Sequence, residues 1–281
     1  MGIIRGYKNI FLAAGFLILF GVSIFLREEI SRMLSFGGQD GVVLIPPELL
    51  PGKKAPLAES ESSPGYGAGV VVIPDNQPVI TIPQYRGRDP SEVRPVPEEV
   101  KLFSEEQRGR LYATIDTHGR AVKANPAFFD GWIKLGLLKK TIGDFEGARD
   151  AWEYAGIIEP GNSLSFSNLG ELYWRYLHEY IKSESNFRIS IEHKPDDIQN
   201  YVSLAELYHY SYKDKADLAD DVLFEGLGKN SGDGTLMRRL AYLYEQRGEL
   251  ASALEWWEKV LAGAPNDEEV KNKVEKIKLR L

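Results

Sequence analysis

The four histidines are the side chains in this sequence that are best suited to metal binding or acid–base catalysis. They are His118, His178, His193 and His209. A zinc site built on a helix would need ligands at close spacing, as in His-Glu-x-x-His, and no such spacing occurs here. Because the chain has no Cys, disulfides, thiolate metal sites and cysteine nucleophiles are excluded as well. We therefore expect no metal-binding site and no catalytic residues.

Motifs for phosphate binding or for a serine nucleophile are also missing. Neither Gly-x-x-x-x-Gly-Lys-Ser/Thr nor Gly-x-Ser-x-Gly occurs in the sequence. The glycine-rich stretch 65–69 lacks the strand-to-helix setting of a nucleotide-binding loop, so we interpret it as a flexible turn. We predict that the protein is not an enzyme and that it has no cofactor-binding site and no small-molecule substrate. An enzyme with a non-motif active site is the least favoured alternative.

The overall charge of the chain disfavours nucleic acid as a partner. The 281 residues carry a net charge of -7, and 43% of them are hydrophobic, which is enough for one or two domains with a real core. An acidic chain is a poor nucleic-acid binder, because such binding normally needs a basic face that neutralises phosphates. Recognition of another protein or peptide is the function class that remains, so the elements that could present binding residues matter most.

A pattern of large and small apolar residues recurs four times in the C-terminal part of the chain. Each copy has a large residue, then Leu three positions later, then Gly or Ala. The large residues are Trp132, Phe166, Tyr201 and Met237, and the small ones are Gly136, Gly170, Ala205 and Ala241. The small residues are 34, 35 and 36 positions apart, a period that fits a helix, a turn and a second helix.

These residues resemble the tetratricopeptide repeat, whose signature is Trp-x-x-Leu-Gly-x-x-Tyr, then Ala-x-x-x-Phe, then Pro. Two positions depart from it: Lys139 replaces the Tyr of the first copy, and Ser231 replaces the closing Pro of the third. The resemblance implies an all-α solenoid in which neighbouring repeats bury one another's apolar faces. The extra residues of the second and third copies are expected in their internal turns, around 177–182 and 212–217.

The resemblance and the spacing together predict the domain organisation. Four repeats are expected at 129–162, 163–196, 197–233 and 234–267. An N-terminal helix and a degenerate half repeat are expected over 98–128, and a capping helix over 268–281. Asp267 is the predicted N-cap of the capping helix, and Val270, Val274, Ile277 and Leu281 lie on its apolar stripe.

The first part of the chain has the composition of a membrane anchor. Residues 10–26 are 17 consecutive uncharged and mostly apolar positions, near the lower limit for a transmembrane helix. Arg5 and Lys8 precede them without any acid, which predicts a cytoplasmic N-terminus at 1–9 and an extracytoplasmic C-terminal domain. We predict a single-pass cell-membrane protein that contacts the lipid bilayer through an uncleaved signal anchor. A cleaved signal peptide and a buried helix are the alternatives.

The anchor and the repeats are separated by a proline-rich segment. Most of the fifteen prolines of the chain fall between residues 46 and 97, where they disfavour helix and favour extended backbone. We predict a juxtamembrane and Pro/Gly-rich linker over 27–97 that holds the repeats away from the bilayer. Its apolar runs at 42–45, 70–73 and 79–82 leave open an ordered packing or docking role.

In tetratricopeptide solenoids the first helices of successive repeats line a concave groove, so the resemblance implies a peptide-binding groove here. The candidate groove residues are of types that anchor protein interfaces or hold a peptide. They are Lys134, Asn168, Trp174, Arg175, Tyr210, Arg238, Arg239 and Tyr242. Acidic groups of the partner are expected to meet Arg238 and Arg239. The alternative for Trp174 and Tyr210 is that they only cover a helix face.

One groove residue matches a more specific binding site in the family. Asn168 corresponds to an asparagine with which chaperone-binding members hold a peptide backbone or terminal carboxylate. Ile133 stands where the first lysine of that carboxylate clamp would be. A clamp for chaperone tails is therefore not expected.

These observations predict a membrane-anchored scaffold that mediates protein–protein interactions outside the cytoplasm and helps to assemble or organise envelope proteins. The identity of the protein or peptide partner is not encoded in any motif. A structural subunit of a larger secretion or pilus-type machine is the alternative.

Overall fold

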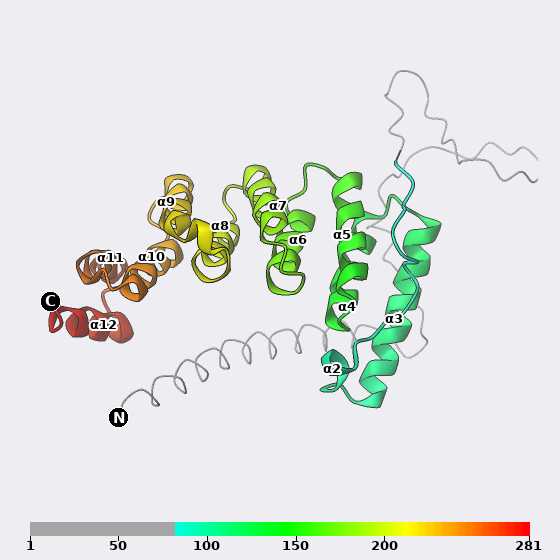
Figure 1. Ribbon diagram of the computed structural model, residues 1–281, viewed down its shortest axis with the longest axis horizontal. Coiled ribbons are helices and arrows are strands. Elements are labelled where there is room, and N and C mark those ends of the chain that lie inside the picture. The colour runs from blue at the N-terminus through cyan, green and yellow to red at the C-terminus, as the bar shows by residue number, and fades with distance from the viewer. Residues whose placement is uncertain (1–81) are drawn as a thin grey trace, which may run out of the picture. The chain divides into compact units, whose positions relative to one another are not determined.

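The computed structural model describes residues 82–281, which form stacked pairs of helices (Figure 1). The chain divides into two units between Val79 and Ile80, and all described residues belong to the second unit. The predicted anchor at 10–26 and most of the predicted linker at 27–97 lie outside the described residues. Over the described range, every helix is too short or too polar to cross a bilayer.

The helices follow one another as hairpins joined by short turns. The hairpins are α4 (Phe129–Thr141) with α5 (Phe145–Ile158), α6 (Leu164–Arg175) with α7 (Tyr180–His193), α8 (Ile198–Glu206) with α9 (Ala219–Lys229), and α10 (Gly234–Arg247) with α11 (Leu250–Gly263). They are preceded by α2 (Pro97–Val100) and α3 (Glu105–Ala124) and followed by α12 (Glu268–Lys278). The predicted fold class is confirmed: the described residues form an all-α, tetratricopeptide-type helix-turn-helix solenoid.

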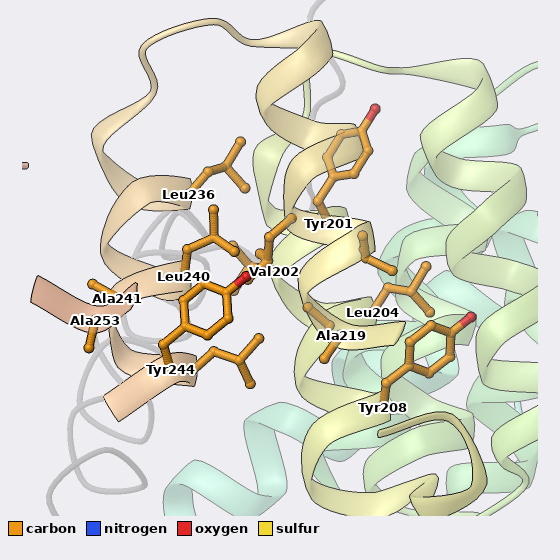
Figure 2. Close-up of a cluster of buried hydrophobic side chains, with 14 of the residues drawn as sticks. Tyr201, Val202, Leu204, Tyr208, Ala219, Leu236, Leu240, Ala241, Tyr244 and Ala253 are labelled. Carbon is orange, nitrogen blue, oxygen red and sulfur yellow. The ribbon is translucent and has the colours of Figure 1, made fainter. Parts of the chain in front are cut away.

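The small residue of each repeat allows its two helices to approach closely. A Cβ atom added to Gly136 would clash with the indole of Trp152, and one added to Gly170 would lie 2.7 Å from the ring of Phe187. Both large rings come from the second helix of the same hairpin and are fully buried. Ala205 and Ala241 belong to one continuous core that runs from α6 to α12. Figure 2 shows Ala241 within this core. The signature spacing therefore encodes the packing of each hairpin.

The signature tyrosines join each repeat to the one before it. In three repeats the tyrosine hydroxyl donates a hydrogen bond to an acid on the second helix of the preceding repeat. The pairs are Tyr173 with Glu153 (2.6 Å), Tyr208 with Glu184 (2.6 Å) and Tyr244 with Asp220 (3.1 Å). The acceptor is charged, and such hydrogen bonds are stronger than those between neutral groups.

These tyrosines should make the solenoid sensitive to alkaline pH. Burial, followed by the hydrogen bond to a carboxylate, raises the pKa of Tyr208 and of Tyr244 from 10.0 to about 12. Because the folded-state pKa is the higher one, this stabilisation is complete below pH 10 and is lost as the pH rises towards 12. Each tyrosine should cost at most about 1.4 kcal/mol per pH unit in that window, which is the limit for one proton. Urea unfolding followed by circular dichroism at increasing pH measures this loss. Tyr208→Phe should reduce its slope, and an unchanged slope would contradict the assignment.

The third repeat departs from a simple hairpin. A π-helical turn, η2 (Leu207–Ser211), follows α8, and its N–H to C=O bond from Tyr212 to Leu207 spans 2.8 Å. A 3-10 helix, η3 (Lys213–Leu218), then leads into α9. The extra residues expected in a turn around 212–217 are therefore helical. Single π turns of this kind are rare and are frequently found at functional sites.

The capping helix begins where the sequence predicts. Its buried apolar stripe ends before the last predicted residue. Asp267 accepts a hydrogen bond from the Val270 N–H at 3.1 Å, which caps the first turn of α12. Val270, Val274 and Ile277 are buried, whereas Leu281 is 67% exposed. Leu281 does not belong to the buried stripe because α12 ends at Lys278.

The last part of the predicted linker is packed against the first repeat. Residues 82–96, which we call the strap, have no regular secondary structure. Tyr85 packs against Trp132 with ring centroids 4.6 Å apart, and Pro83 accepts a hydrogen bond from the Tyr154 hydroxyl at 2.7 Å. At the other end of the strap, the Val96 N–H donates to the Ile142 carbonyl at 2.7 Å. The packed domain thus begins well before residue 97.

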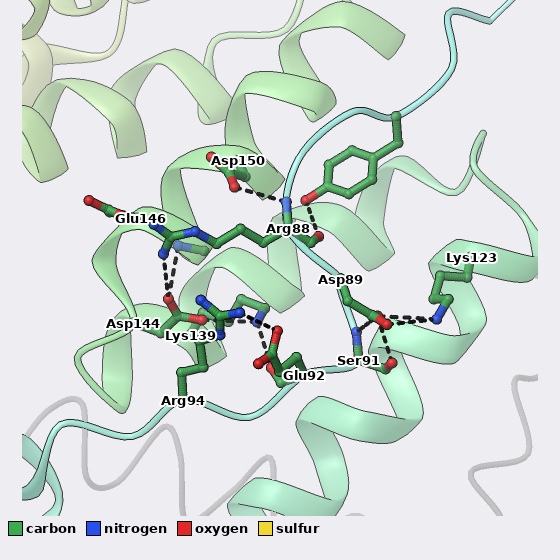
Figure 3. Close-up of polar contacts among 12 residues, drawn as sticks. Arg88, Asp89, Ser91, Glu92, Arg94, Lys123, Lys139, Asp144, Glu146 and Asp150 are labelled. Atoms are coloured by element: carbon green, nitrogen blue, oxygen red, sulfur yellow. Dashed lines mark hydrogen bonds and ion pairs between the residues drawn. The ribbon is translucent and has the colours of Figure 1, made fainter.

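The strap also explains why Lys139 replaces the signature tyrosine in the first repeat. Lys139 is 2% exposed, and its ammonium group donates to Asp144 at 3.0 Å and to the Glu92 carbonyl of the strap at 2.8 Å (Figure 3). In the later repeats, the residue at this position finds its acceptor in the preceding repeat. No complete repeat precedes α4 among the described residues, and the strap backbone supplies the acceptor there.

Candidate protein-interaction surface

The predicted groove residues lie on the first helices of the hairpins and on the turn that extends one of them. Lys134 is on α4; Asn168, Trp174 and Arg175 are on or at the end of α6; Tyr210 is on η2; Arg238, Arg239 and Tyr242 are on α10. We call the surface formed by these elements the first-helix face. Its side chains differ sharply in burial and in pairing, which decides what each could bind.

Most charges on this face are paired between neighbouring repeats. The pairs are Lys140 with Glu171 (3.4 Å), Arg175 with Glu206 (3.7 Å), Arg239 with Glu206 (2.7 Å), Arg238 with Asp267 (2.7 Å) and Lys273 with Glu245 (3.0 Å). Arg238 and Arg239, which the sequence suggested for binding acidic groups of a partner, therefore already have carboxylate partners within the chain. A partner's acid would have to compete with Asp267 or Glu206.

Trp174 is part of the core. Its side chain is 6% exposed, and its indole N–H donates to the Ser211 hydroxyl at 2.8 Å. The guanidinium of Arg175 lies over the ring, 3.9 Å from its centre, which is a cation–π contact. Trp174 thus attaches α6 to the π-helical turn η2 and offers almost no surface to a partner.

Tyr210 and Tyr242 are the exposed aromatic residues of the predicted set. They are 51% and 36% exposed, respectively. Between them is a hollow of about 30 Å³. Its apolar lining residues are Val202, Ala205, Leu223 and Leu243, and its polar ones are Glu206, His209 and Arg239. Tyrosine and arginine beside a hollow with a partly apolar lining are residue types that are enriched at interface anchor sites.

The neighbours of the two tyrosines fix their orientation. The Tyr210 hydroxyl donates to Oε1 of Gln246 at 3.2 Å, and Nε2 of His209 lies 3.0 Å from the same oxygen. The Tyr242 ring packs edge-on against the buried Trp257 at 4.8 Å, and the ammonium of Lys273 lies 4.6 Å from the Tyr242 ring centre. The hollow is therefore held in one shape by both the π turn and the capping helix.

Lys134 and Asn168 lie away from this hollow. Lys134 is exposed on α4, and Asn168 is half-buried on α6. Burial, and then the nearby Lys134 charge, lower the pKa of His118. His118 itself is half-buried on α3. Neither Lys134 nor Asn168 is among the residues that line the Tyr210 and Tyr242 hollow.

The set predicted from the sequence omits Leu223, which lines the hollow from the second helix of the third repeat. It also omits Lys273 of the capping helix, whose ammonium group lies over the Tyr242 ring. Lys273 follows Arg238 by 35 residues, so extending the repeat period into the capping helix would have identified it. Leu223 occupies the position of the large residue of the second helix, which the signature assigns to packing alone. Over residues 82–281, no group of three or more His, Asp or Glu side chains is arranged to hold a metal ion.

Comparison with known proteins finds likeness in fold only. No family model and no curated protein matches the sequence. The crystal structure of MamA is 17% identical, with a match that covers 61% of this chain and 95% of the MamA chain and a TM-score of 0.47. The tetratricopeptide protein TTC0263 of Thermus thermophilus is 20% identical, with 65% and 96% coverage and a TM-score of 0.43. A tetratricopeptide repeat protein of Parabacteroides merdae is 17% identical, with 64% and 71% coverage and a TM-score of 0.49.

Proposed function

We propose that this protein is a scaffold that binds a segment of a partner protein on its first-helix face, at the hollow between Tyr210 and Tyr242. The observation that carries the proposal is the exposure of these two rings beside a hollow with both apolar and charged lining residues. Tyrosine is enriched among residues that contribute most to binding, because it buries a large apolar area and still carries a polar group. Stacked repeats form the extended surface that such binding uses.

The rigidity of the face supports the same proposal. The ion pairs of Glu206 with Arg175 and Arg239 connect three successive repeats through their first helices. Each exposed pair contributes only about 0 to 1 kcal/mol to stability. These ion pairs should matter more for binding than for stability. A surface whose side chains are already ordered loses less conformational entropy when a partner docks.

Membrane anchoring belongs to the proposal as well. Residues 10–26 would span the membrane with 1–9 in the cytoplasm, and the repeats would organise envelope proteins outside the cytoplasm. The uncharged run and the basic residues ahead of it, Arg5 and Lys8, support this orientation. Protease added to cells with a permeable outer layer and an intact inner membrane should digest the repeats. Protection until the inner membrane is opened would contradict the proposed topology.

The binding role is tested with the full-length chain carrying Tyr210→Ala and Tyr242→Ala together. After crosslinking in intact cells, we expect the recovery of bound partner to fall about tenfold or more, as for loss of an interface anchor. The matched control is Phe224→Ala, since Phe224 is 41% exposed on α9, a second helix. Thermal melting of each variant separates binding from folding.

The same experiment separates the two candidate functions. Undiminished capture by the double variant, with normal melting, would contradict binding at this hollow. Co-purification with other proteins at a fixed stoichiometry that survives both substitutions would favour the structural subunit of a larger machine.

A further inference from the structure

We infer that the occupant of the Tyr210 and Tyr242 hollow is an acidic segment of a partner protein, and that this segment continues from the hollow onto the basic side of the capping helix α12. The inference rests on the proposed function and goes further, because it gives the chemistry of the partner and adds a second element to the site. Three observations support it: an excess of cations at the hollow, hydrogen-bond donors left over for a ligand, and a row of basic residues on α12.

Two arginines share one carboxylate at the hollow. Arg239 pairs with Glu206 at 2.7 Å, and Arg175 approaches the same carboxylate at 3.7 Å. Both arginine side chains are about half exposed, and Glu206 is the less exposed member of each pair. One negative charge cannot compensate two positive ones, so this site is positive within a chain whose net charge is -7. It attracts an acidic group and repels a basic one.

Arg239 and Tyr242 also keep hydrogen-bond donors that a ligand could use. A guanidinium group has several N–H donors in a fixed plane, and the contact with Glu206 engages one terminal nitrogen of Arg239. The Tyr242 ring contacts Trp257 and Lys273, but its hydroxyl has no hydrogen-bond partner within residues 82–281. Arg239 and Tyr242 are three positions apart on α10 and therefore lie on the same side of it. Carboxylate oxygens accept from both kinds of donor, and such charge-assisted bonds are the strong ones.

The capping helix extends the positive surface. Lys273, Lys276 and Arg280 are spaced three and four residues apart, so they share one side of α12 and of the turn that follows it. The charged residues that line the shallow depression on this side are Lys273, Lys276, Arg280, Glu245 and Glu269. Lys273 also lies 4.6 Å from the Tyr242 ring centre, so this side of α12 adjoins the hollow. Lys276 and Arg280 have no carboxylate partner in the part of the chain that the structure describes, which leaves both free to meet acids of a partner.

Arg238 is excluded from this site, although it precedes Arg239 directly. It pairs one to one with Asp267 at 2.7 Å, and the same carboxylate caps the first turn of α12. It lines neither the hollow nor the depression beside α12. The sequence suggested both arginines for binding acidic groups, whereas the structure assigns this role to Arg239 and gives Arg238 a role within the fold.

The experiment measures binding of three synthetic peptides to the full-length chain in a non-ionic detergent by isothermal titration calorimetry. The first peptide has Glu residues on both sides of a central Leu, and its ends are blocked so that no terminal charge contributes. The second has Gln in place of each Glu, and the third has Lys. We expect the Glu peptide to bind about tenfold or more tighter than the Gln peptide and the Lys peptide to bind weakest. Raising the salt concentration from about 0.05 M to about 0.5 M should weaken the Glu peptide about tenfold, because salt screens the matched charges.

Two substitutions with matched controls locate the binding. Arg239→Gln should weaken the Glu peptide about tenfold, and Lys276→Gln should weaken it about threefold. Because Lys276 has no ion pair within the described residues, its removal leaves the pairs of the fold intact. Arg238→Gln and Lys271→Gln are the controls and should change the affinity by less than about twofold. Lys271 lies on another side of α12, where it pairs with Glu268 at 2.7 Å.

Glu206→Gln gives a test with the opposite sign. Glu206 competes with the ligand for Arg175 and Arg239. Its neutralisation should therefore tighten binding of the Glu peptide about threefold or more, and it should leave the Gln peptide unchanged. Thermal melting shows whether the variant is folded. Unchanged or weaker binding of the Glu peptide by the folded variant would contradict the inference.

Several other results would overturn it. These are equal binding of the Glu and Gln peptides, tighter binding of the Lys peptide, binding of none of the peptides, and an effect of Arg238→Gln as large as that of Arg239→Gln. Tighter binding of single-stranded DNA than of the Glu peptide would assign the surface to a nucleic acid. Concentration-dependent self-association that Arg239→Gln abolishes would assign it to a second copy of the chain.

The failure of this inference can be told from the failure of the proposed function. If crosslinked partners are lost with both tyrosine substitutions while the Glu and Gln peptides bind equally, the proposed function stands and only the ligand chemistry is wrong. If Arg239→Gln abolishes binding of the Glu peptide while the double tyrosine variant keeps its crosslinked partners, the acid-binding surface is real and the proposed function at the hollow is wrong.

Discussion

Replacing Lys139 by Ala should lower the free energy of unfolding by about 3 to 5 kcal/mol, the cost of breaking a buried ion pair by removing one partner. The side chains of Lys139 and Asp144 are 3% and 4% exposed, respectively. The substitution removes the donor to the Glu92 carbonyl and the 3.0 Å partner of the buried Asp144 carboxylate. Asp144 then keeps only the more distant Arg88 at 3.6 Å and the Gly147 N–H. The first repeat and the strap should both loosen. Urea unfolding followed by circular dichroism measures the change.

The control for Lys139→Ala is Lys123→Ala. Lys123 also pairs with the strap, through Asp89 at 3.1 Å, but both side chains are 49% exposed. Exposed pairs contribute about 0 to 1 kcal/mol, so this variant should unfold almost as the unmodified chain does. Hydrogen exchange should show loss of protection in α4 and α5 for Lys139→Ala alone. Equal effects of the two substitutions would mean that the buried Lys139 contacts do not hold the strap against the first repeat.

Replacing Trp174 by Ala should destabilise the protein by a comparable amount, about 3 to 5 kcal/mol, the typical cost of truncating a buried aromatic residue. The substitution opens a cavity between α6 and the third repeat and leaves the Ser211 hydroxyl without its indole donor. Thermal and urea unfolding measure the loss. The expected defect is therefore in folding, although the sequence suggested Trp174 as a binding residue.

Arg175→Ala provides the comparison for Trp174→Ala. Arg175 is adjacent in sequence, 46% exposed, and contacts both the Trp174 ring and Glu206. Its removal should cost less than about 1 kcal/mol. A Trp174→Ala variant that melts normally and yet loses its partner would contradict the placement of this residue in the core.

The helix hairpins could be predicted from the sequence because the pairing of a small residue with a large ring is local and recurs with the repeat period. Gly136 and Gly170 stand where a large ring of the paired helix must approach, and this requirement recurs once per repeat. Each copy of the pattern therefore places a hairpin, independently of the rest of the chain. The N-cap of the final helix, Asp267, follows from a similarly local rule.

The strap and the pairing of the groove charges could not be predicted in this way. Nothing in the sequence around Glu92 indicates that its carbonyl meets Lys139, because the contact joins segments 47 residues apart. Proline content correctly argued against helix there, but packing without regular structure leaves no periodic pattern. Likewise, the local sequence around Arg239 does not indicate whether this side chain is free for a partner or paired within the chain. In the structure it pairs with Glu206 of the preceding repeat.

The strap also determines where a mechanical load would enter the repeats. Tension applied to the chain at Ile82 would act first on the Pro83 contact with Tyr154 and on the Tyr85 ring against Trp132, and then on the Arg88 N–H bond to Asp150. Next along the strap are the Asp89 pair with Lys123 of α3 and the Glu92 contact with Lys139 of α4. The load would therefore enter through the first repeat and then be shared with α3.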